Sequence, residues 1–161
     1  VPGGRRRQDS VASGLRSLTS NVQGILVHDG ARPLLSSAIV VRCIKALEKH
    51  PAFLLAITPT DTLHLKVSNC AQPTTSRSTF ISAQTPQGFI ASLLPDLLAN
   101  LENPNLNFTD EVTALFHTYG IMAYIIDGER ENVKITYPED LVVFRPLLLK
   151  RAREIKKRLC L

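Results

Sequence analysis

Tryptophan is absent from this 161-residue sequence, which also has only one methionine and three cysteines. Cys43, Cys70 and Cys160 are odd in number, widely spaced and free of any C-x-x-C pair. That pattern argues against a disulfide framework or a zinc site and fits a reducing compartment. No apolar run approaches the roughly 20 residues of a membrane-spanning helix, and the first residues lack a signal-peptide pattern. These absences indicate a globular protein that has no membrane as a partner.

Neither sign of charge is in excess outside the carboxyl terminus. The net charge is +5, from 19 Lys and Arg against 14 Asp and Glu. Residues 150–161 hold six of the basic residues and one acidic residue, which leaves 13 of each sign in residues 1–149. Because cations suit the carboxyl-terminal end of a helix, we interpret the excess as a solvated helix end. Nucleic acid is not an expected partner.

Apolar spacing predicts strands that alternate with helices in one domain over residues 1–161. The predicted strands cover residues 24–27, 52–57, 121–126 and 133–136. The first helix is predicted after a polar loop at 3–10, the second after a cap at Ser36 or Ser37, and the third from Phe89 despite Pro95. The fourth is predicted after a cap at Thr109 and the last after a capping box at Thr136-Tyr137-Pro138-Glu139. This alternation indicates an α/β fold with a mainly parallel sheet. Residues 62–80 are rich in Ser and Thr and predict an arm of strands and turns outside that sheet.

Asp29 and Arg32 lie where a predicted strand meets a loop. In open α/β sheets ligands bind outside the carboxyl ends of the strands, and a carboxylate there can hold a ribose hydroxyl or a magnesium ion. A turn aspartate that caps the next segment would have the same sequence signature. Arg32, three residues on, favours a phosphorylated substrate, and Gly30 would let a ligand approach the backbone closely.

Two further cations are candidates for phosphate contacts. Arg77 stands among serines and threonines, where it could clamp a phosphate or be an ordinary surface arginine. Lys134 lies in the predicted strand 133–136, shortly after Glu131. From the residues alone, an ion pair between Lys134 and Glu131 is the interpretation that we prefer over a metal site at Glu131.

A series of short segments carries a more specific signal. They are Gly3-Gly4, Arg7-Gln8-Asp9-Ser10-Val11, Gly14-Leu15, Val27-His28-Asp29-Gly30-Ala31-Arg32-Pro33, Asp61-Thr62, Arg77, Thr85-Pro86-Gln87 with Phe89, Thr109-Asp110-Glu111, Asn132-Val133-Lys134-Ile135-Thr136 and Pro138-Glu139-Asp140-Leu141. In this order and spacing they resemble the methylerythritol phosphate cytidylyltransferases over nearly the whole chain. The resemblance implies a Rossmann-like nucleotidyltransferase fold, a three-layer sandwich with an extruded β-arm.

The resemblance also implies a reaction and a set of roles. Cytidylate passes from CTP to 2-C-methyl-D-erythritol 4-phosphate, pyrophosphate is released, Mg²⁺ is the cofactor, and the product enters non-mevalonate isoprenoid synthesis. Arg77 and Lys134 match the residues that position the acceptor for attack. The remaining matched positions are Gly4, Ser10, Asp29 and Gly30 for the nucleotide, Arg32, Thr62 and Thr85 for the sugar phosphate, and Asp29 for the metal.

Two departures from the family pattern bear on activity. Gly30 stands where the family usually has alanine, a mild change that keeps backbone access. The family's first strand and its glycine-rich loop, which carries an arginine and a nearby Pro-Lys-Gln, have no counterpart in residues 1–161. Because that loop supplies cations to the triphosphate, we expect a chain that lacks the first βα unit and is inactive alone. Arg5, Arg6 and Arg7 are not a substitute.

Two other functions stay open. A ribitol or other pentitol phosphate cytidylyltransferase would share the fold and nearly all the motifs, and a non-catalytic binding or dimerisation remnant would keep the fold without turnover. The family pairs two subunits through an extended arm, so residues 62–80 are the expected homodimer contact. The expected location is the bacterial cytoplasm, or the plastid of a eukaryote.

Overall fold

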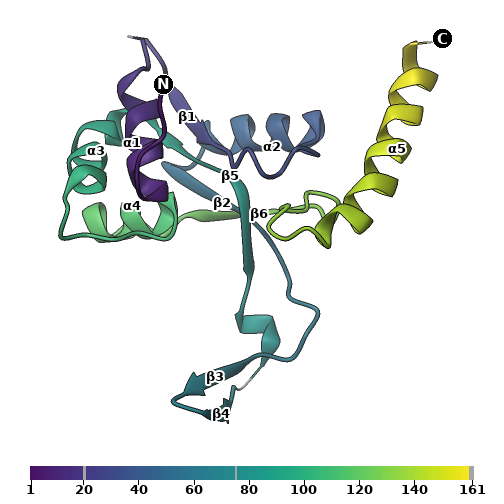
Figure 1. The fold of residues 1–161 in the computed structure, drawn as a ribbon. Coiled ribbons are helices and arrows are strands. Elements are labelled where there is room, and N and C mark those ends of the chain that lie inside the picture. The colour runs from purple at the N-terminus through teal and green to yellow at the C-terminus, as the bar shows by residue number, and fades with distance from the viewer. Residues whose placement is uncertain (20, 75, 160–161) are drawn as a thin grey trace.

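The computed structural model describes residues 1–19, 21–74 and 76–159, so Cys160 lies outside the described residues. Its central sheet has four strands (Figure 1). In sheet order they are β1 (Gly24–Val27), β5 (Ser82–Ile90), β2 (Ala52–Ile57) and β6 (Tyr124–Asp127). β5 runs antiparallel to β1 and β2, whereas β6 runs parallel to β2. Three strands therefore point one way, which confirms the α/β prediction, and β5 is the exception.

Helices cover both faces of this sheet (Figure 1). One face carries α1 (Arg7–Arg16), α3 (Leu94–Glu102) and α4 (Glu111–Tyr119), and the other carries α2 (Ser37–Leu47). Neighbouring side chains of a strand point to opposite faces. Ala52 of β2 accordingly joins the core under α1, α3 and α4, while Phe53 joins the core under α2. The result is the three-layer sandwich that the resemblance implied.

Local capping fixes where two of the helices begin. Ser36 caps α2 as predicted, because its Oγ accepts a hydrogen bond from the main-chain N–H of Ile39 at 3.1 Å. Asp110 caps α4, because its Oδ1 accepts from the N–H of Thr113 at 2.9 Å. The prediction of Thr109 as this cap was wrong by one residue.

The first helix begins inside the segment predicted to be a loop. α1 starts at Arg7, so the loop ends four residues before the predicted limit at residue 10. The Asp9 carboxylate accepts a hydrogen bond from the main-chain N–H of Arg6 at 2.9 Å and so closes the first turn.

β5 was not predicted, and the helix predicted from Phe89 begins later. β5 extends to Ile90, the 3₁₀ turn η2 (Ala91–Leu93) follows, and α3 starts at Leu94. Pro95 lies in the first turn of α3, where its missing N–H costs nothing, so it neither kinks nor splits the helix.

Apolar spacing did not predict β5, because the sequence of this strand is largely polar. Its register against β2 jumps from Leu54–Gln87 to Leu55–Gln84, so two residues of β5 bulge out of the ladder. Pro86 is one of them, and proline has no N–H to give to a neighbouring strand. Gln84 and Gln87 are nonetheless buried, because their amides hydrogen-bond to groups at the site described below.

The predicted arm is present and projects away from the sandwich (Figure 1). It contains the hairpin β3 (His64–Val67) with β4 (Cys70–Pro73) and the 3₁₀ turn η1 (Arg77–Thr79). Every residue of both hairpin strands is exposed. The arm therefore has no core of its own.

The end of the chain differs from the prediction in two ways. Residues 133–136 are not a strand, because the main-chain bond recorded there is a single one from Ile135 N–H to Ala31 O at 2.8 Å. The last helix, α5 (Asp140–Leu159), begins four residues after Thr136, which was the predicted cap. Asp140 instead accepts hydrogen bonds from the N–H groups of Thr136 and Tyr137. Among the described residues, no helix is both long and apolar enough to cross a bilayer.

Candidate active site

The site forms where β1 and β6 end at the same edge of the sheet. β1 is followed by His28 and Asp29, and β6 is followed by the loop that leads to Lys134. β5 runs the opposite way, so its first half, with Gln84 and Thr85, lies at that same edge. The carboxyl ends of such strands are where open α/β sheets bind ligands.

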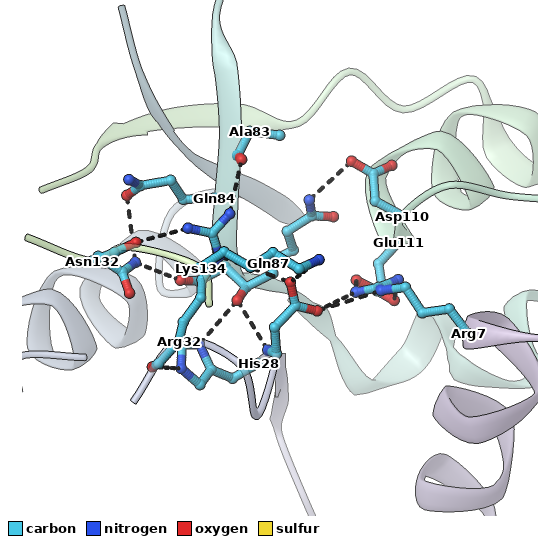
Figure 2. Close-up of polar contacts among 12 residues, drawn as sticks. Arg7, His28, Arg32, Ala83, Gln84, Gln87, Asp110, Glu111, Asn132 and Lys134 are labelled. Carbon is cyan, nitrogen blue, oxygen red and sulfur yellow. Dashed lines mark hydrogen bonds and ion pairs between the residues drawn. The ribbon is translucent and has the colours of Figure 1, made fainter. Parts of the chain in front are cut away.

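Asp29 lies among three cations at the centre of this site. The cations are Arg7, Arg32 and Lys134, whose side chains are labelled in Figure 2. Its Oδ2 is 3.0 Å from Lys134 Nζ and 3.8 Å from Arg32 Nε, and its Oδ1 is 3.2 Å from Arg7 Nη2. Burial alone would raise the pKa of this carboxyl, but the Lys134 hydrogen bond and charge, with help from Arg7, make the net pKa lower than usual. Asp29 is therefore a carboxylate at neutral pH.

A buried glutamate holds Arg7 in place. Glu111, in the first turn of α4, is 1% exposed, and its two oxygens accept from Arg7 Nη1 at 2.7 Å and Nη2 at 3.1 Å. This hydrogen bond with Glu111 raises the pKa of the Arg7 guanidinium. Arg7 thus bridges two carboxylates, one on α4 and one after β1, and neutralises part of their charge.

Arg32 is held by main-chain carbonyl groups. Its Nη1 donates to the carbonyl of Asn132 at 2.7 Å and its Nη2 donates to that of Ala83 at 3.4 Å. Burial lowers the pKa of Arg32, although the Asp29 charge partly offsets it. The guanidinium is thereby fixed beside Asp29 and keeps its charge.

Thr85 and His28 set the main chain around Asp29. Thr85 Oγ1 accepts from the Asp29 N–H at 3.0 Å and lies 3.1 Å from His28 Nδ1. The other ring nitrogen, Nε2, lies 2.9 Å from the carbonyl oxygen of Arg32. These contacts tie the loop after β1 to β5, so Asp29 and Arg32 have one arrangement.

Two adjoining pockets open around Asp29. The first, about 290 Å³, is lined mostly by charged and polar residues, among them Arg32, Thr85 and Lys134, and we call it the polar pocket. The second, about 470 Å³, runs along α1 and β1 and is lined mainly by apolar side chains, together with Ser10 and Gly30. A charged pocket beside an apolar one suits a ligand with a phosphate at one end and a ring at the other.

The two candidate glycines differ in how tightly they are packed. Gly4 donates its N–H to Ser10 Oγ at 2.9 Å, and a Cβ added at Gly4 would lie 2.2 Å from the Cβ of Asp9. Only glycine fits there without a shift of the backbone. A Cβ added at Gly30 would meet nothing within 4 Å. Gly30 therefore leaves room for a ligand against the backbone rather than filling a steric need.

The two remaining candidate site residues, Thr62 and Arg77, lie in the arm, apart from Asp29 and its three cations. Arg77 is exposed, and its Nη1 donates to the carbonyl of Thr60 at 2.8 Å. Thr62 is also exposed, and neither residue lines a pocket that contains Asp29 in the described part of the chain. One molecule thus brings together Arg32, Thr85 and Lys134 but not Thr62 and Arg77.

The ion pair predicted between Lys134 and Glu131 was wrong. Lys134 pairs with Asp29, and Glu131 pairs with Lys150 of α5 at 2.6 Å. Without the strand geometry that was assumed for 133–136, the chain turns Lys134 toward the end of β1.

Sequence reasoning gave no role to several residues that build the site. They are Arg7, His28, Gln84, Gln87, Asp110, Glu111 and Asn132. Most of them belong to the short segments that carried the resemblance, and that was the available signal. Their contacts join positions up to 104 residues apart, which no local pattern contains.

The side chains do not by themselves make a magnesium site. Both Asp29 oxygens are engaged by Lys134 and Arg7, and no group of three or more potential metal-ligating side chains occurs in residues 1–19, 21–74 and 76–159. Mg²⁺ commonly takes one or two carboxylates together with substrate phosphates. The donor set here, one carboxylate already paired with cations, does not fit a resident ion, and no chemical step below is assigned to one.

Comparisons with known proteins identify relatives of this chain. The sequence profile of "IspD: 2-C-methyl-D-erythritol 4-phosphate cytidylyltransferase" matches residues 1–150. A 2-C-methyl-D-erythritol 4-phosphate cytidylyltransferase from Synechococcus elongatus is 42% identical over 153 residues, which are 94% of this chain and 65% of that protein. The chain spans about 65% of the length of the curated Synechococcus relatives that it matches.

Solved structures give the same result. The crystal structure of the enzyme of that name from Thermus thermophilus matches with a TM-score of 0.78 at 32% identity, over 89% of this chain and 69% of that one. The 4-diphosphocytidyl-2C-methyl-D-erythritol synthase from Anaerococcus prevotii matches with a TM-score of 0.85 at 28% identity, over 92% and 66%. The chain therefore belongs to the 2-C-methyl-D-erythritol 4-phosphate cytidylyltransferase family.

Proposed function

We propose that the whole protein transfers cytidylate from CTP to 2-C-methyl-D-erythritol 4-phosphate and releases pyrophosphate. The observation that carries the proposal is the cluster of Lys134 and Arg32 around Asp29, in a polar pocket at the carboxyl ends of β1 and β6. The names of the relatives supply the substrates.

In this reaction the protein has to position the two substrates and to stabilise negative charge. An oxygen of the acceptor phosphate attacks the α-phosphorus of CTP, and the bond from that phosphorus to the oxygen of the leaving pyrophosphate breaks. The attacking group is already an anion, so no protein nucleophile is needed. Cations that align the two phosphates and stabilise the charge in the transition state supply most of the catalysis.

The nucleotide is assigned to the α1 side of the site. Its base and ribose would occupy the 470 Å³ pocket, with Ser10 and Gly30 in its lining and the Gly4 N–H bonded to Ser10. The Asp29 carboxylate can accept hydrogen bonds from ribose hydroxyls. Arg7, held by Glu111, keeps that carboxylate in place.

The acceptor phosphate is assigned to the polar pocket. Lys134 is 43% exposed, and its ammonium can turn from Asp29 to an incoming phosphate. Arg32 and Thr85 line the same pocket from the other side. Thr62 and Arg77 would reach an acceptor only from the arm of a second subunit, so the proposal includes a homodimer in which residues 62–80 cross between sites.

Two further expectations belong to this proposal. Mg²⁺ would enter as the counter-ion of the CTP triphosphate, not as a resident metal. Residues 1–161 alone would turn over poorly, because their described part offers Arg7, Arg32 and Lys134 near Asp29 and no glycine-rich cationic loop for the outer phosphates. The cytoplasmic or plastid location expected from the sequence also remains part of the proposal.

Pyrophosphate release with a panel of acceptors tests the proposal. The whole protein is given CTP with 2-C-methyl-D-erythritol 4-phosphate, with ribitol 5-phosphate or with no acceptor. We expect release that depends on the methylerythritol phosphate. Faster release with ribitol 5-phosphate would make the pentitol enzyme correct instead, and no acceptor-dependent release would favour the non-catalytic remnant.

A further inference from the structure

Two buried amide side chains join the loop after β6 to the central strand β5. Asn132 is fully buried, and its Nδ2 donates to the carbonyl of Thr85 at 2.8 Å and to Oε1 of Gln84 at 3.4 Å. Gln84 is 5% exposed, and its Nε2 donates to the carbonyl of Glu129 at 3.0 Å while its Oε1 accepts from the Glu129 N–H at 3.3 Å. We call Gln84 and Asn132 the amide pair.

The amide pair lies beside the two cations of the polar pocket, Arg32 and Lys134 (Figure 2). The Asn132 carbonyl accepts the 2.7 Å hydrogen bond from Arg32 Nη1, and Lys134 follows two residues later. A change in the place of Asn132 would therefore move both cations relative to Asp29. Gly128 closes the other end of the loop, where an added Cβ would lie 2.4 Å from Gln84 Oε1. The loop has little freedom to slide along β5.

The hydrogen bonds of this region are not optimised for stability alone. Arg32 Nε and Asn132 Oδ1 are buried and have no hydrogen-bond partner among the described residues. Leaving a buried polar atom unpaired costs free energy, most of all on a charged group. The Arg32 guanidinium is nonetheless held by two carbonyl groups and the Asp29 carboxylate. A cation fixed by surrounding groups in this way is typical of a preorganised binding site.

We propose that Gln84 and Asn132 are positioning residues, whose hydrogen bonds set the place of Arg32 and Lys134 opposite Asp29 and so align the acceptor phosphate. Neither side chain touches the reacting atoms; both act through the two cations. The catalytic part of this inference rests on the proposed function, whereas the geometric part, the place of Lys134, does not.

The geometric part is tested on the whole protein without any substrate. The lysines are reductively methylated with ¹³C-formaldehyde, which keeps their charge, and the Lys134 signal is identified by its loss in Lys134→Arg. Asp29→Asn gives the signal position of Lys134 released from its carboxylate. We expect Asn132→Ala to move the Lys134 signal toward that released position, and Gln84→Ala to move it part of the way.

A matched control shows that the effect is local. Asn100 also donates its side-chain amide to a neighbouring element, to Thr118 Oγ1 at 2.9 Å between α3 and α4. Asn100→Ala should lower the melting temperature and leave the Lys134 signal where it is. If Asn132→Ala fails to fold, Gln84→Ala carries the test. A Lys134 signal at its wild-type position in every amide variant that folds overturns the proposal.

Steady-state kinetics of the whole protein test the catalytic part. Asn132→Ala should lower kcat/KM for the acceptor by up to about 100-fold, the cost of misplacing a group by about 1 Å, and change KM for CTP much less. If Asn132 acts partly through Lys134, adding Asn132→Ala to Lys134→Ala should lower kcat/KM by a smaller factor than Asn132→Ala does in the wild type. Fully multiplicative losses overturn that link. A wild-type protein without transfer activity would refute the proposed function, and the Lys134 signal would still decide the geometric part.

Discussion

The loop before α1 packs so closely on the helix that position 4 has no room for a Cβ atom. We predict that Gly4→Ala destabilises the protein by about 1–3 kcal/mol, because the new Cβ would lie 2.2 Å from the Asp9 Cβ and must displace α1. Gly30→Ala, with nothing within 4 Å, is the control and should change the free energy of unfolding very little. Urea unfolding of both variants measures this, and equal losses in the two would contradict the packing.

Asp29 should make the protein sensitive to acid. Its pKa is lowered in the folded state, so its contribution to stability is present above the unfolded value of about 3.9 and is lost as the pH falls through the folded value. We predict that between about pH 5 and pH 2 the unfolding free energy of Asp29→Asn falls less steeply than that of the wild type. Parallel curves, measured by urea unfolding at each pH, would mean that the Asp29 ion pairs contribute no net stability.

At the scale of elements, the start of α4 ties the fold to the site. Asp110 caps α4 through Thr113 and also accepts from Gln87 Nε2 of β5 at 2.9 Å. We predict that Asp110→Ala lowers the free energy of unfolding by about 1 kcal/mol or more, a typical cost for a lost cap. Thr109→Ala, one residue earlier, should cost clearly less. Thermal melts compare the two, and a larger loss for Thr109→Ala would mean that the cap is misassigned.

The elements that the sequence predicted well are those with regular apolar spacing. β2 and α2 show it, and both appear where they were expected. β5 does not, because Gln84, Pro86 and Gln87 interrupt its apolar pattern although the strand is central. Its polar side chains are buried only because distant segments satisfy them, and local spacing holds no information on such partners.

The candidate site was predictable to the same degree. Asp29 follows a strand end, a position that suits a ligand site and a turn aspartate equally, and Arg32 three residues later favoured the ligand site. Only the family resemblance predicted Lys134 as a site residue, because the neighbouring residues alone favoured an ion pair with the wrong partner, Glu131. The true partner of Lys134 is fixed by a loop that makes a main-chain bond to Ala31 and four hydrogen bonds to β5 through the amides of Gln84 and Asn132. Those contacts exist only after the sheet has formed.

At the scale of the whole molecule, the arm projects from the sandwich with its hairpin strands exposed (Figure 1). The β3–β4 hairpin is exposed throughout, including Leu65 at 53% and Val67 at 52%, and exposed strand edges tend to associate. We predict that a two-fold partner covers it in one isologous interface. Replacing residues 66–76 by a short Gly-Ser turn in the whole protein should give a monomer with weaker acceptor affinity. Light scattering that shows an unchanged dimer would rule out the arm as the contact.

In the proposed reaction, the Asp29 cluster aligns an acceptor phosphate with the α-phosphate of CTP. Phosphorus-31 NMR of the reaction mixture tests this, because it identifies the bond that forms. With the whole protein, CTP and 2-C-methyl-D-erythritol 4-phosphate, we expect a new diphosphate diester together with pyrophosphate. Lys134→Ala should nearly abolish both signals while its melting temperature stays close to that of the wild type. Unchanged diester formation by folded Lys134→Ala, or CMP in place of the diester with the wild type, would refute the proposed alignment.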